Sequence, residues 1–197
     1  SVTALVAELA GRAKTASRRL ALLSRADKDA ALHAIADALD AAIPAVVQAN
    51  ADDLTQGRER GMAEGLLDRL MLDEARIRAI AEAVREVAAL PDPVGEVVRG
   101  STLANGLQIR QVRVPMGVVG MIYEARPNVT VDAAALGLKS GNAVILRGGS
   151  AAAASNRALV AVIRAALAER GLPEDAVTLL DEGGHDAARA LMTARER

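Results

Sequence analysis

The chain has 197 residues, enough for one domain with a buried core, and 51% of them are apolar although only 1% are aromatic. A formal net charge of −1, no strongly basic half and a single Tyr without Phe or Trp argue against a nucleic-acid surface. No uncharged apolar run reaches the roughly 18 residues that would span a bilayer, and no basic n-region opens the chain, so we expect a cytoplasmic protein without membrane contact.

The sequence does not indicate a thiol-dependent site or a metal site. The chain has no Cys, which excludes a disulfide, a thiolate metal ligand and a thiol nucleophile within it. His33 and His185 are far apart in sequence, and we interpret both as surface or packing residues rather than ligands.

Residues 1–90 have the three- and four-residue apolar spacing that is typical of helices. Ser24 and Asp27 stand at the distance of a capping box, and Asp73 is placed to cap a later helix. That later helix must end before Pro91. The polar stretch Gln48–Asp53 is expected to interrupt the helical pattern.

The apolar period changes after residue 94. Asn105-Gly106 lies between two β-prone runs, and because both central residues of a tight hairpin turn adopt positive φ, this dipeptide predicts a hairpin near 95–114. Both faces of the predicted hairpin carry polar groups. Such a ribbon is a poor isolated structure, so we expect it to be solvated or paired with another chain.

Residues 115–197 alternate between short apolar runs and helical patterns. Predicted strands are Gly117–Tyr123, which is expected to be buried on both faces, then 143–146 and 177–180. Predicted helices are 129–139, 155–170 and one that follows Gly183-Gly184. The alternation predicts a parallel sheet with right-handed crossovers. Three strands leave it unfinished, because such sheets usually have five or six.

Polar residues follow the first predicted strand, at the edge where open parallel sheets bind ligands. The segment 123–128 contains Glu124, Arg126 and Asn128. Asn128 could donate to a developing oxyanion, and Arg126 could bind a phosphate or carboxylate. Alternatively, Asn128 and Arg126 simply cap the next helix, and the pattern leaves both interpretations open.

A second candidate segment, Arg147-Gly148-Gly149-Ser150, follows the second predicted strand. Two glycines beside a cation allow the backbone to approach a ligand closely. The alternative is a turn that uses glycine because it needs positive φ, and the residues alone favour this alternative. Neither G-x-G-x-x-G nor G-x-x-x-x-G-K-[ST] occurs, so a dinucleotide bound here would not use those fingerprints.

The strings V-P-M-G-V-V-G-M-I at 114–122 and G-N-A-V-I-L at 141–146 resemble the core of the aldehyde dehydrogenase superfamily. I-Y-E-A-R-P-N-V-T at 122–130 with L-R-G-G-S at 146–150 is similar to one branch only, the γ-glutamyl phosphate reductases. Three further segments fit the same branch: 49–54, 66–70 and 88–95. The resemblance covers nearly the whole chain.

This resemblance implies an α/β fold of aldehyde dehydrogenase type: an incomplete Rossmann-like parallel sheet preceded by a helical segment and a β-hairpin arm. Residues 1–94 would be the helical amino-terminal part of the cofactor domain, and 95–114 the hairpin of an oligomerisation arm. Residues 115–197 would be the first half of a Rossmann-like NADP-binding domain, and the catalytic domain would be absent.

The resemblance also implies a reaction: NADPH-dependent reduction of L-glutamate 5-phosphate to the 5-semialdehyde, with phosphate release, in proline biosynthesis. A Cys thiolate from beyond residue 197 would be the nucleophile, so these residues alone should be inactive. Asn128 would be the oxyanion donor and, with Arg126, would bind substrate. Cofactor-binding positions would be Tyr123, Glu124, Arg147, Gly148, Gly149 and Ser150.

Ser150 stands where NAD-preferring relatives carry a Glu, and Arg147 where relatives carry a Lys that meets the adenosine ribose. This pair therefore favours NADP on grounds of charge. The family implies a homo-oligomer formed through the 95–114 hairpin, and association with a glutamate 5-kinase is possible.

Two functions other than that of a γ-glutamyl phosphate reductase are also considered for this sequence. Another aldehyde or acyl-phosphate dehydrogenase is disfavoured, because ordinary aldehyde dehydrogenases have P-W-N where this chain has E-A-R-P-N-V-T. A non-catalytic nucleotide-binding or structural module of the same fold would lack a thiol by nature.

Overall fold

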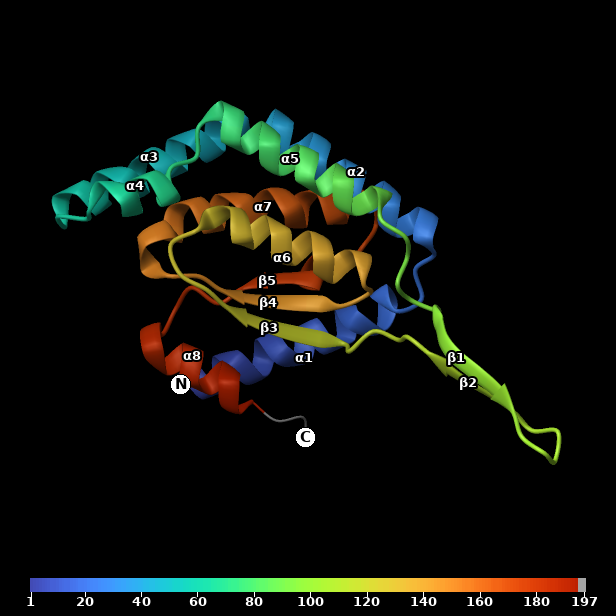
Figure 1. Ribbon diagram of the computed structural model, residues 1–197. Coiled ribbons are helices and arrows are strands. Elements are labelled where there is room, and N and C mark those ends of the chain that lie inside the picture. Colours follow the sequence, from blue (N-terminus) through green and yellow to red (C-terminus); the bar gives the residue numbers. More distant parts are fainter. Residues whose placement is uncertain (195–197) are drawn as a thin grey trace.

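The computed structural model describes residues 1–194. Figure 1 shows layers built around a three-stranded sheet, with strand order β3 (Val118–Ile122), β4 (Ala143–Arg147) and β5 (Val177–Leu179). One face carries α6 (Pro127–Lys139) and α7 (Ala153–Glu169), and a further layer covers these two helices. That layer comprises α2 (Arg25–Ala41), α3 (Ile43–Glu59), α4 (Glu64–Leu70) and α5 (Glu74–Ala89).

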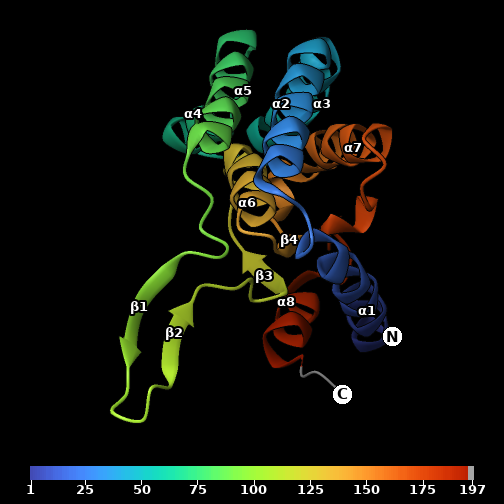
Figure 2. The ribbon, with the colours of Figure 1, turned by 90° about the vertical axis from the view of Figure 1, so that its right-hand side faces the viewer.

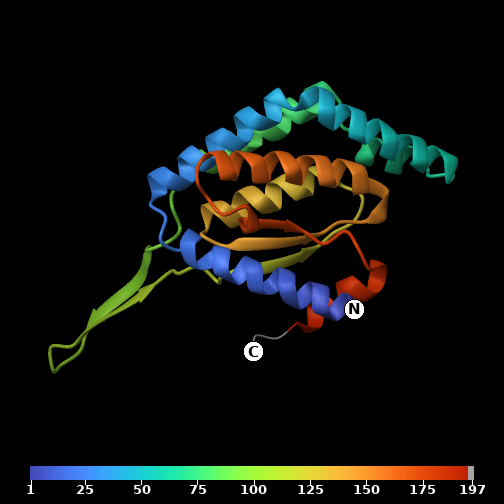
Figure 3. The same cartoon turned by 180° about the vertical axis from the view of Figure 1, so that it is seen from behind.

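The opposite face of the sheet carries α1 (Val2–Leu20) and α8 (Gly184–Thr193). Figure 3 shows α1 lying across the strands from behind. Short 3₁₀ turns, η1 (Ser150–Ala152) and η2 (Glu174–Ala176), precede α7 and β5. One apolar core runs through the helical layers and the sheet, so the segments before and after the hairpin fold together.

Local signals placed several helix ends correctly. The predicted capping box is present: Asp27 N–H donates to Ser24 Oγ, and Ser24 N–H donates to Asp27 Oδ2. Asp73 Oδ1 accepts from the Arg76 N–H, and α5 ends at Ala89, before Pro91.

The expectation that Gln48–Asp53 interrupts the helical pattern was wrong, because α3 runs through this stretch from Ile43 to Glu59. Asn50 and Asp53 are polar residues on the buried face of that helix. Their side chains bond to neighbouring segments, which removes the usual cost of burying polar groups.

The predicted parallel sheet is confirmed, with β4 paired to β3 on one side and to β5 on the other. The prediction that Gly117–Tyr123 is buried on both faces was wrong. β3 lies at an edge of the three-stranded sheet, and Met121 and Ile122 are exposed.

One helical segment of the described residues is long and apolar enough to cross a membrane, Ser150–Glu169, and the bent pair α2 and α3 passes the same test jointly. Ser150–Glu169 contains α7, which contributes Leu159, Ile163 and Leu167 to the buried core. Such an apolar helix is equally typical of a globular core.

The predicted hairpin is present as β1 (Val97–Thr102) antiparallel to β2 (Gln108–Val112), and Figure 2 shows it standing away from the layers. Its turn differs from the expected one, because Gly106 has φ of +86° while Asn105 does not adopt positive φ. Gly106 N–H donates to the Leu103 carbonyl, and Leu103 N–H donates to that of Leu107. This is a three-residue loop that closes with a left-handed glycine.

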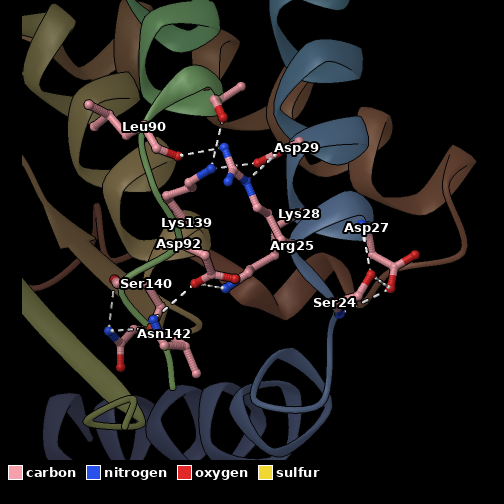
Figure 4. Close-up of polar contacts among 12 residues, drawn as sticks. Ser24, Arg25, Asp27, Lys28, Asp29, Leu90, Asp92, Lys139, Ser140 and Asn142 are labelled. Atoms are coloured by element: carbon pink, nitrogen blue, oxygen red, sulfur yellow. Dashed lines mark hydrogen bonds and ion pairs between the residues drawn. The ribbon is translucent and has the colours of Figure 1, made fainter. Parts of the chain in front are cut away.

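A buried ionic cluster anchors the segment that leads into the hairpin (Figure 4). Lys28 is 1% exposed, and its Nζ lies 2.7 Å from Asp92 Oδ1, which also accepts from the Val94 N–H. Lys139 Nζ lies 2.5 Å from Asp29 Oδ1 and donates to a backbone carbonyl of α5. The root of the hairpin is thus bonded to α2, next to a second ion pair between α2 and α6.

The segment that leaves the hairpin is fixed at the same place. Gly117 N–H donates to Asn142 Oδ1 over 2.8 Å. Gly141 adopts φ of +74° in the turn after α6, and a Cβ there would stand 2.9 Å from the Pro115 ring. Both ends of the hairpin therefore meet the turn between α6 and β4, at the opposite end of the sheet from the polar loops considered next.

Candidate functional site

Two segments lie side by side where β3 and β4 end: the Tyr123–Asn128 loop and the Arg147–Ser150 turn. The Tyr123 N–H donates to the Arg147 carbonyl over 3.1 Å, which extends the pairing of the two strands by one bond. A Cβ built on Gly149 would stand 3.4 Å from the Glu124 backbone. Both segments leave the sheet on the side away from the hairpin (Figure 1). All the site residues expected from the sequence therefore gather at this edge.

Three side chains of the site are available to a ligand. Within residues 1–194, the side chains of Glu124, Arg126 and Ser150 form no hydrogen bond or ion pair, and all three residues are exposed. The alternative in which Arg126 and Asn128 cap α6 is wrong, since α6 begins after Arg126 without any side-chain cap. The guanidinium of Arg126 thus has no structural task among the described residues.

Asn128 lies in the first turn of α6 and is partly exposed. Its Nδ2 donates to Asp132 Oδ2 over 3.4 Å, one turn further along. Desolvation raises the pKa of the Asp132 carboxyl, and the bond from Asn128 opposes that rise. At 3.4 Å this surface contact is long, so the amide can exchange it for a stronger acceptor at little cost.

The Arg147 side chain, which was predicted to bind a cofactor, is bonded to two backbone carbonyls of the protein itself. Its guanidinium donates to the Gly148 carbonyl, and Nη2 donates to the Gly184 carbonyl at the start of α8 over 2.9 Å. Its Nε is buried and has no partner among the described residues. Arg147 therefore joins the turn to α8, and a buried donor remains to be satisfied.

The sequence favoured a turn in which Gly148 and Gly149 supply positive φ, and the structure shows another reason for glycine. Neither Gly148 nor Gly149 adopts positive φ, so that alternative is wrong. Gly148 is needed for close approach instead, because a Cβ there would stand 2.3 Å from Asn156 Nδ2. Gly149 would accept a Cβ at ordinary contact distance, so the packing of these residues does not demand glycine there.

The amino end of α7, directly after the turn, is already occupied by a carboxylate. Asp53 Oδ1 accepts from the Ala154 N–H, and Oδ2 accepts from both the N–H and the hydroxyl of Ser155. Asn50 Nδ2 also donates to Ser155 Oγ. Since helix amino ends attract anions, Asp53 takes the position that a phosphate uses in many dinucleotide sites. This agrees with the missing glycine fingerprint.

Sequence reasoning missed the residues that support the site. Asn50 and Asp53 belong to the polar stretch and to the 49–54 segment of the family resemblance, and neither pattern indicates a supporting role. A helical signal was present, because Val46, Asn50, Asp53 and Gly57 follow three- and four-residue steps and all four are buried. Thr130 ends the 122–130 string of the family resemblance and Asn156 lies in a predicted helix, but neither fact indicates that both are buried behind the two segments.

A groove of about 520 Å³ lies elsewhere, between α1, α7 and β5. The arginines that line it pair with carboxylates: Arg12 and Arg164 with Asp175, and Arg157 with Asp181. None of the site residues expected from the sequence lines it. The groove is thus separate from the two polar segments.

Known proteins match almost the whole chain. The model of the "Aldehyde dehydrogenase family" matches residues 3–196. The γ-glutamyl phosphate reductase of Kineococcus radiotolerans is 67% identical over 184 residues, covering 93% of this chain and 43% of that protein. The γ-glutamyl phosphate reductase of Leifsonia xyli is 60% identical over 183 residues, covering 93% of this chain and 44% of that protein.

A solved structure supports the fold. The crystal structure of γ-glutamyl phosphate reductase from Thermotoga maritima has a TM-score of 0.92 and 41% identity, covering 95% of this chain and 45% of that one. This chain therefore spans less than half the length of the curated relatives it matches.

Proposed function

Because this chain belongs to the aldehyde dehydrogenase family, we propose that it forms part of a γ-glutamyl phosphate reductase. The parent enzyme reduces L-glutamate 5-phosphate to L-glutamate 5-semialdehyde and releases phosphate, with NADPH as reductant. The observation that carries this proposal is the 67% identity to a γ-glutamyl phosphate reductase over 184 residues of this chain. The meeting of these segments at the carboxyl edge of the sheet supports it.

The residues at this edge fit the phosphorylated ribose of NADP. A guanidinium, Arg147, and a small neutral hydroxyl, Ser150, stand in one turn, and the buried Arg147 Nε lacks a partner among residues 1–194. Neither residue would repel a 2′-phosphate, and a guanidinium binds phosphate well. Bound NADPH would supply the hydride, while Arg147 and Ser150 hold the ribose phosphate and the Gly148-Gly149 backbone lies beside it. Tyr123 and Glu124 complete the cofactor side of the site.

Substrate would meet the other end of the same edge. Arg126 has a free guanidinium that could pair with the carboxylate or phosphate of the substrate. Asn128 would turn its amide from Asp132 toward the carbonyl oxygen as negative charge develops there. The nucleophilic thiolate must come from the rest of the parent protein, because this chain has no Cys.

The organisation of the parent enzyme is part of the same proposal. Residues 1–94 and 115–197 would form the first part of one NADP-binding domain, and they share one core here. Residues 95–114 would be an arm that joins subunits. The hairpin exposes apolar side chains that a partner could cover: Val97, Val98, Leu103, Leu107, Ile109 and Val112. Association with a glutamate 5-kinase and a cytoplasmic location remain predictions.

The test is an assay of the full-length parent protein in the reverse direction, with glutamate 5-semialdehyde, phosphate and NADP⁺. We expect NADP⁺ reduction that requires phosphate and is faster than with NAD⁺. Turnover without phosphate would indicate an ordinary aldehyde dehydrogenase that hydrolyses its acyl intermediate. NADP⁺ binding without any turnover would indicate the non-catalytic module.

A further inference from the structure

A chain of hydrogen bonds lies behind the two polar segments and connects three elements. The Tyr123 hydroxyl lies 2.5 Å from Thr130 Oγ1, and Thr130 Oγ1 donates to Asn156 Oδ1 over 2.8 Å. Tyr123 follows β3, Thr130 is in the first turns of α6, and Asn156 is in the first turn of α7. Thr130 is fully buried, and Asn156 is 2% exposed.

The direction of this chain follows from its chemistry. Asn156 Oδ1 is a carbonyl oxygen and can only accept, so the single hydrogen of the Thr130 hydroxyl is used there. The Tyr123 hydroxyl must therefore donate to Thr130. Burial raises the pKa of Tyr123, so the phenol stays protonated at neutral pH and can donate this bond. Thr130 is the one residue that both accepts and donates.

Tyr123 and Asn156, the two ends of this series of hydrogen bonds, both contact the Arg147–Ser150 turn. A Cβ on Gly148 would stand 2.3 Å from Asn156 Nδ2 and 3.3 Å from Tyr123 Cε2. The Gly148 backbone thus rests against the Asn156 amide and the Tyr123 ring. Tyr123 is also the first residue of the other polar segment. The Thr130 hydroxyl therefore joins the two side chains, Tyr123 and Asn156, against which the Gly148 backbone rests.

We propose that Thr130 is a positioning residue that holds the two ligand-binding segments at a fixed separation. This inference rests on the proposed function for its kinetic consequences. Thr130 touches neither segment's exposed side chains, so it acts through Tyr123 and Asn156. A buried hydrogen-bonded network specifies one arrangement more strictly than apolar packing does, which suits a site that must place cofactor and substrate together.

Isosteric variants of the full-length parent protein test this role. Thr130→Val keeps the volume and removes the hydroxyl, whereas Thr130→Ser keeps the hydroxyl. Thr55→Val is the matched control, because Thr55 is an exposed helix residue whose Oγ1 donates only to the Ala51 carbonyl. We expect Thr130→Val to raise the KM for NADP⁺ and lower kcat, together by about 100-fold in kcat/KM. Thr130→Ser and Thr55→Val should stay within about threefold of wild type.

A purely structural role predicts a different pattern. If Thr130→Val lowers only the unfolding midpoint, and kcat and KM at low temperature are unchanged, the proposal is overturned. It is also overturned if Thr130→Ser is as impaired as Thr130→Val. Should Thr130→Val fail to fold, Tyr123→Phe removes only the first hydrogen bond of the network, and the amides of residues 147–150 must then exchange with deuterium faster than in wild type.

Hydrogen–deuterium exchange separates this inference from the proposed reaction, because it needs no turnover. Amides of residues 123–128 and 147–150 should exchange faster in Thr130→Val than in wild type or Thr130→Ser. Unchanged exchange in both segments would refute the positioning role even in an active enzyme. If the wild-type protein shows no reductase activity and Thr130→Val still exchanges faster, the positioning role stands and only the proposed reaction is refuted.

Discussion

Asp53 of α3 closes the amino end of α7, where its Oδ2 accepts from both the N–H and the hydroxyl of Ser155, each over 2.7 Å. The two residues are 102 positions apart in the chain. Because α7 begins directly after the Arg147–Ser150 turn, this contact fixes the start of the helix on which that turn rests. A carboxylate at this end also satisfies N–H groups that no residue of α7 itself caps.

Removal of the Asp53 carboxylate should therefore destabilise the protein markedly. Asp53→Ala leaves the first N–H groups of α7 and the Ser155 hydroxyl without their acceptor, and we expect a loss of about 2 kcal/mol in the free energy of unfolding. Urea denaturation of the full-length parent protein measures it. Asp52→Ala, at the exposed neighbouring position, should change stability little. Equal effects of the two substitutions would contradict the capping role.

Acid should weaken the anchor of the hairpin root. Burial works to raise the pKa of Asp92, but the bonds from Lys28 and the Val94 N–H outweigh it, so the pKa is lowered in the folded protein. A lowered folded pKa stabilises the protein above the unfolded value, about 3.9, and this stabilisation is lost as pH falls through the folded pKa.

Asp92→Asn should consequently cost about 2 to 4 kcal/mol at pH 7, because Lys28 stays buried without its counter-ion. The cost should shrink as the pH falls through the lowered pKa of Asp92, because the wild-type side chain also becomes neutral there. Denaturation curves at pH 7 and in acid measure this difference. Asp37→Asn, whose side chain is 75% exposed, serves as control. A cost for Asp92→Asn that does not depend on pH would rule out the ionic explanation.

Charge reversal at the turn tests cofactor choice. Arg147→Glu places a carboxylate beside Ser150, and it should weaken NADP(H) binding at least about tenfold more than NAD(H) binding. Titration of both cofactors into the full-length protein gives the two dissociation constants. Arg189→Glu, an exposed position on α8, controls for general charge effects. Equal loss of both cofactors would instead reflect the lost Arg147 bond to the Gly184 carbonyl.

The amide of Asn128 should matter for turnover more than for binding. Asn128→Ala removes the proposed oxyanion donor, and we expect turnover to fall on the order of 100-fold with little change in cofactor affinity. Asp132→Asn alters the present partner of Asn128 without removing the amide. If Asp132→Asn slows turnover as much as Asn128→Ala, the oxyanion role is not supported.

Charge on the hairpin should prevent subunit association. Ile109→Asp places a carboxylate among the exposed apolar side chains of β1 and β2, where burial against a partner would require its desolvation. Light scattering after size exclusion should show a lower molar mass for the full-length variant. Leu22→Asp, on an exposed apolar residue next to the end of α1, should leave the mass unchanged. Retention of the wild-type mass by Ile109→Asp would exclude the hairpin as the joining element.

Local patterns predicted much of this fold. Ser24 with Asp27, Asp73 with Pro91, and the glycines at 141 and 183 mark helix ends through bonds and dihedral angles within a few residues. The alternation after residue 115 likewise predicted the parallel strands. The side-by-side placement of the Tyr123–Asn128 loop and the Arg147–Ser150 turn followed from these strands, because neighbouring parallel strands end at the same edge.

What remained hidden depends on contacts between distant residues. No local pattern shows that Asp53 would meet Ser155, that Thr130 would bond to both Tyr123 and Asn156, or that Gly148 would rest on an amide from α7. A buried polar group is tolerable only where its partner arrives from another element, and that depends on the packing of whole helices. The meeting of the two polar segments could be predicted from the order of amino acids, whereas the contacts that support these segments exist only in the folded chain.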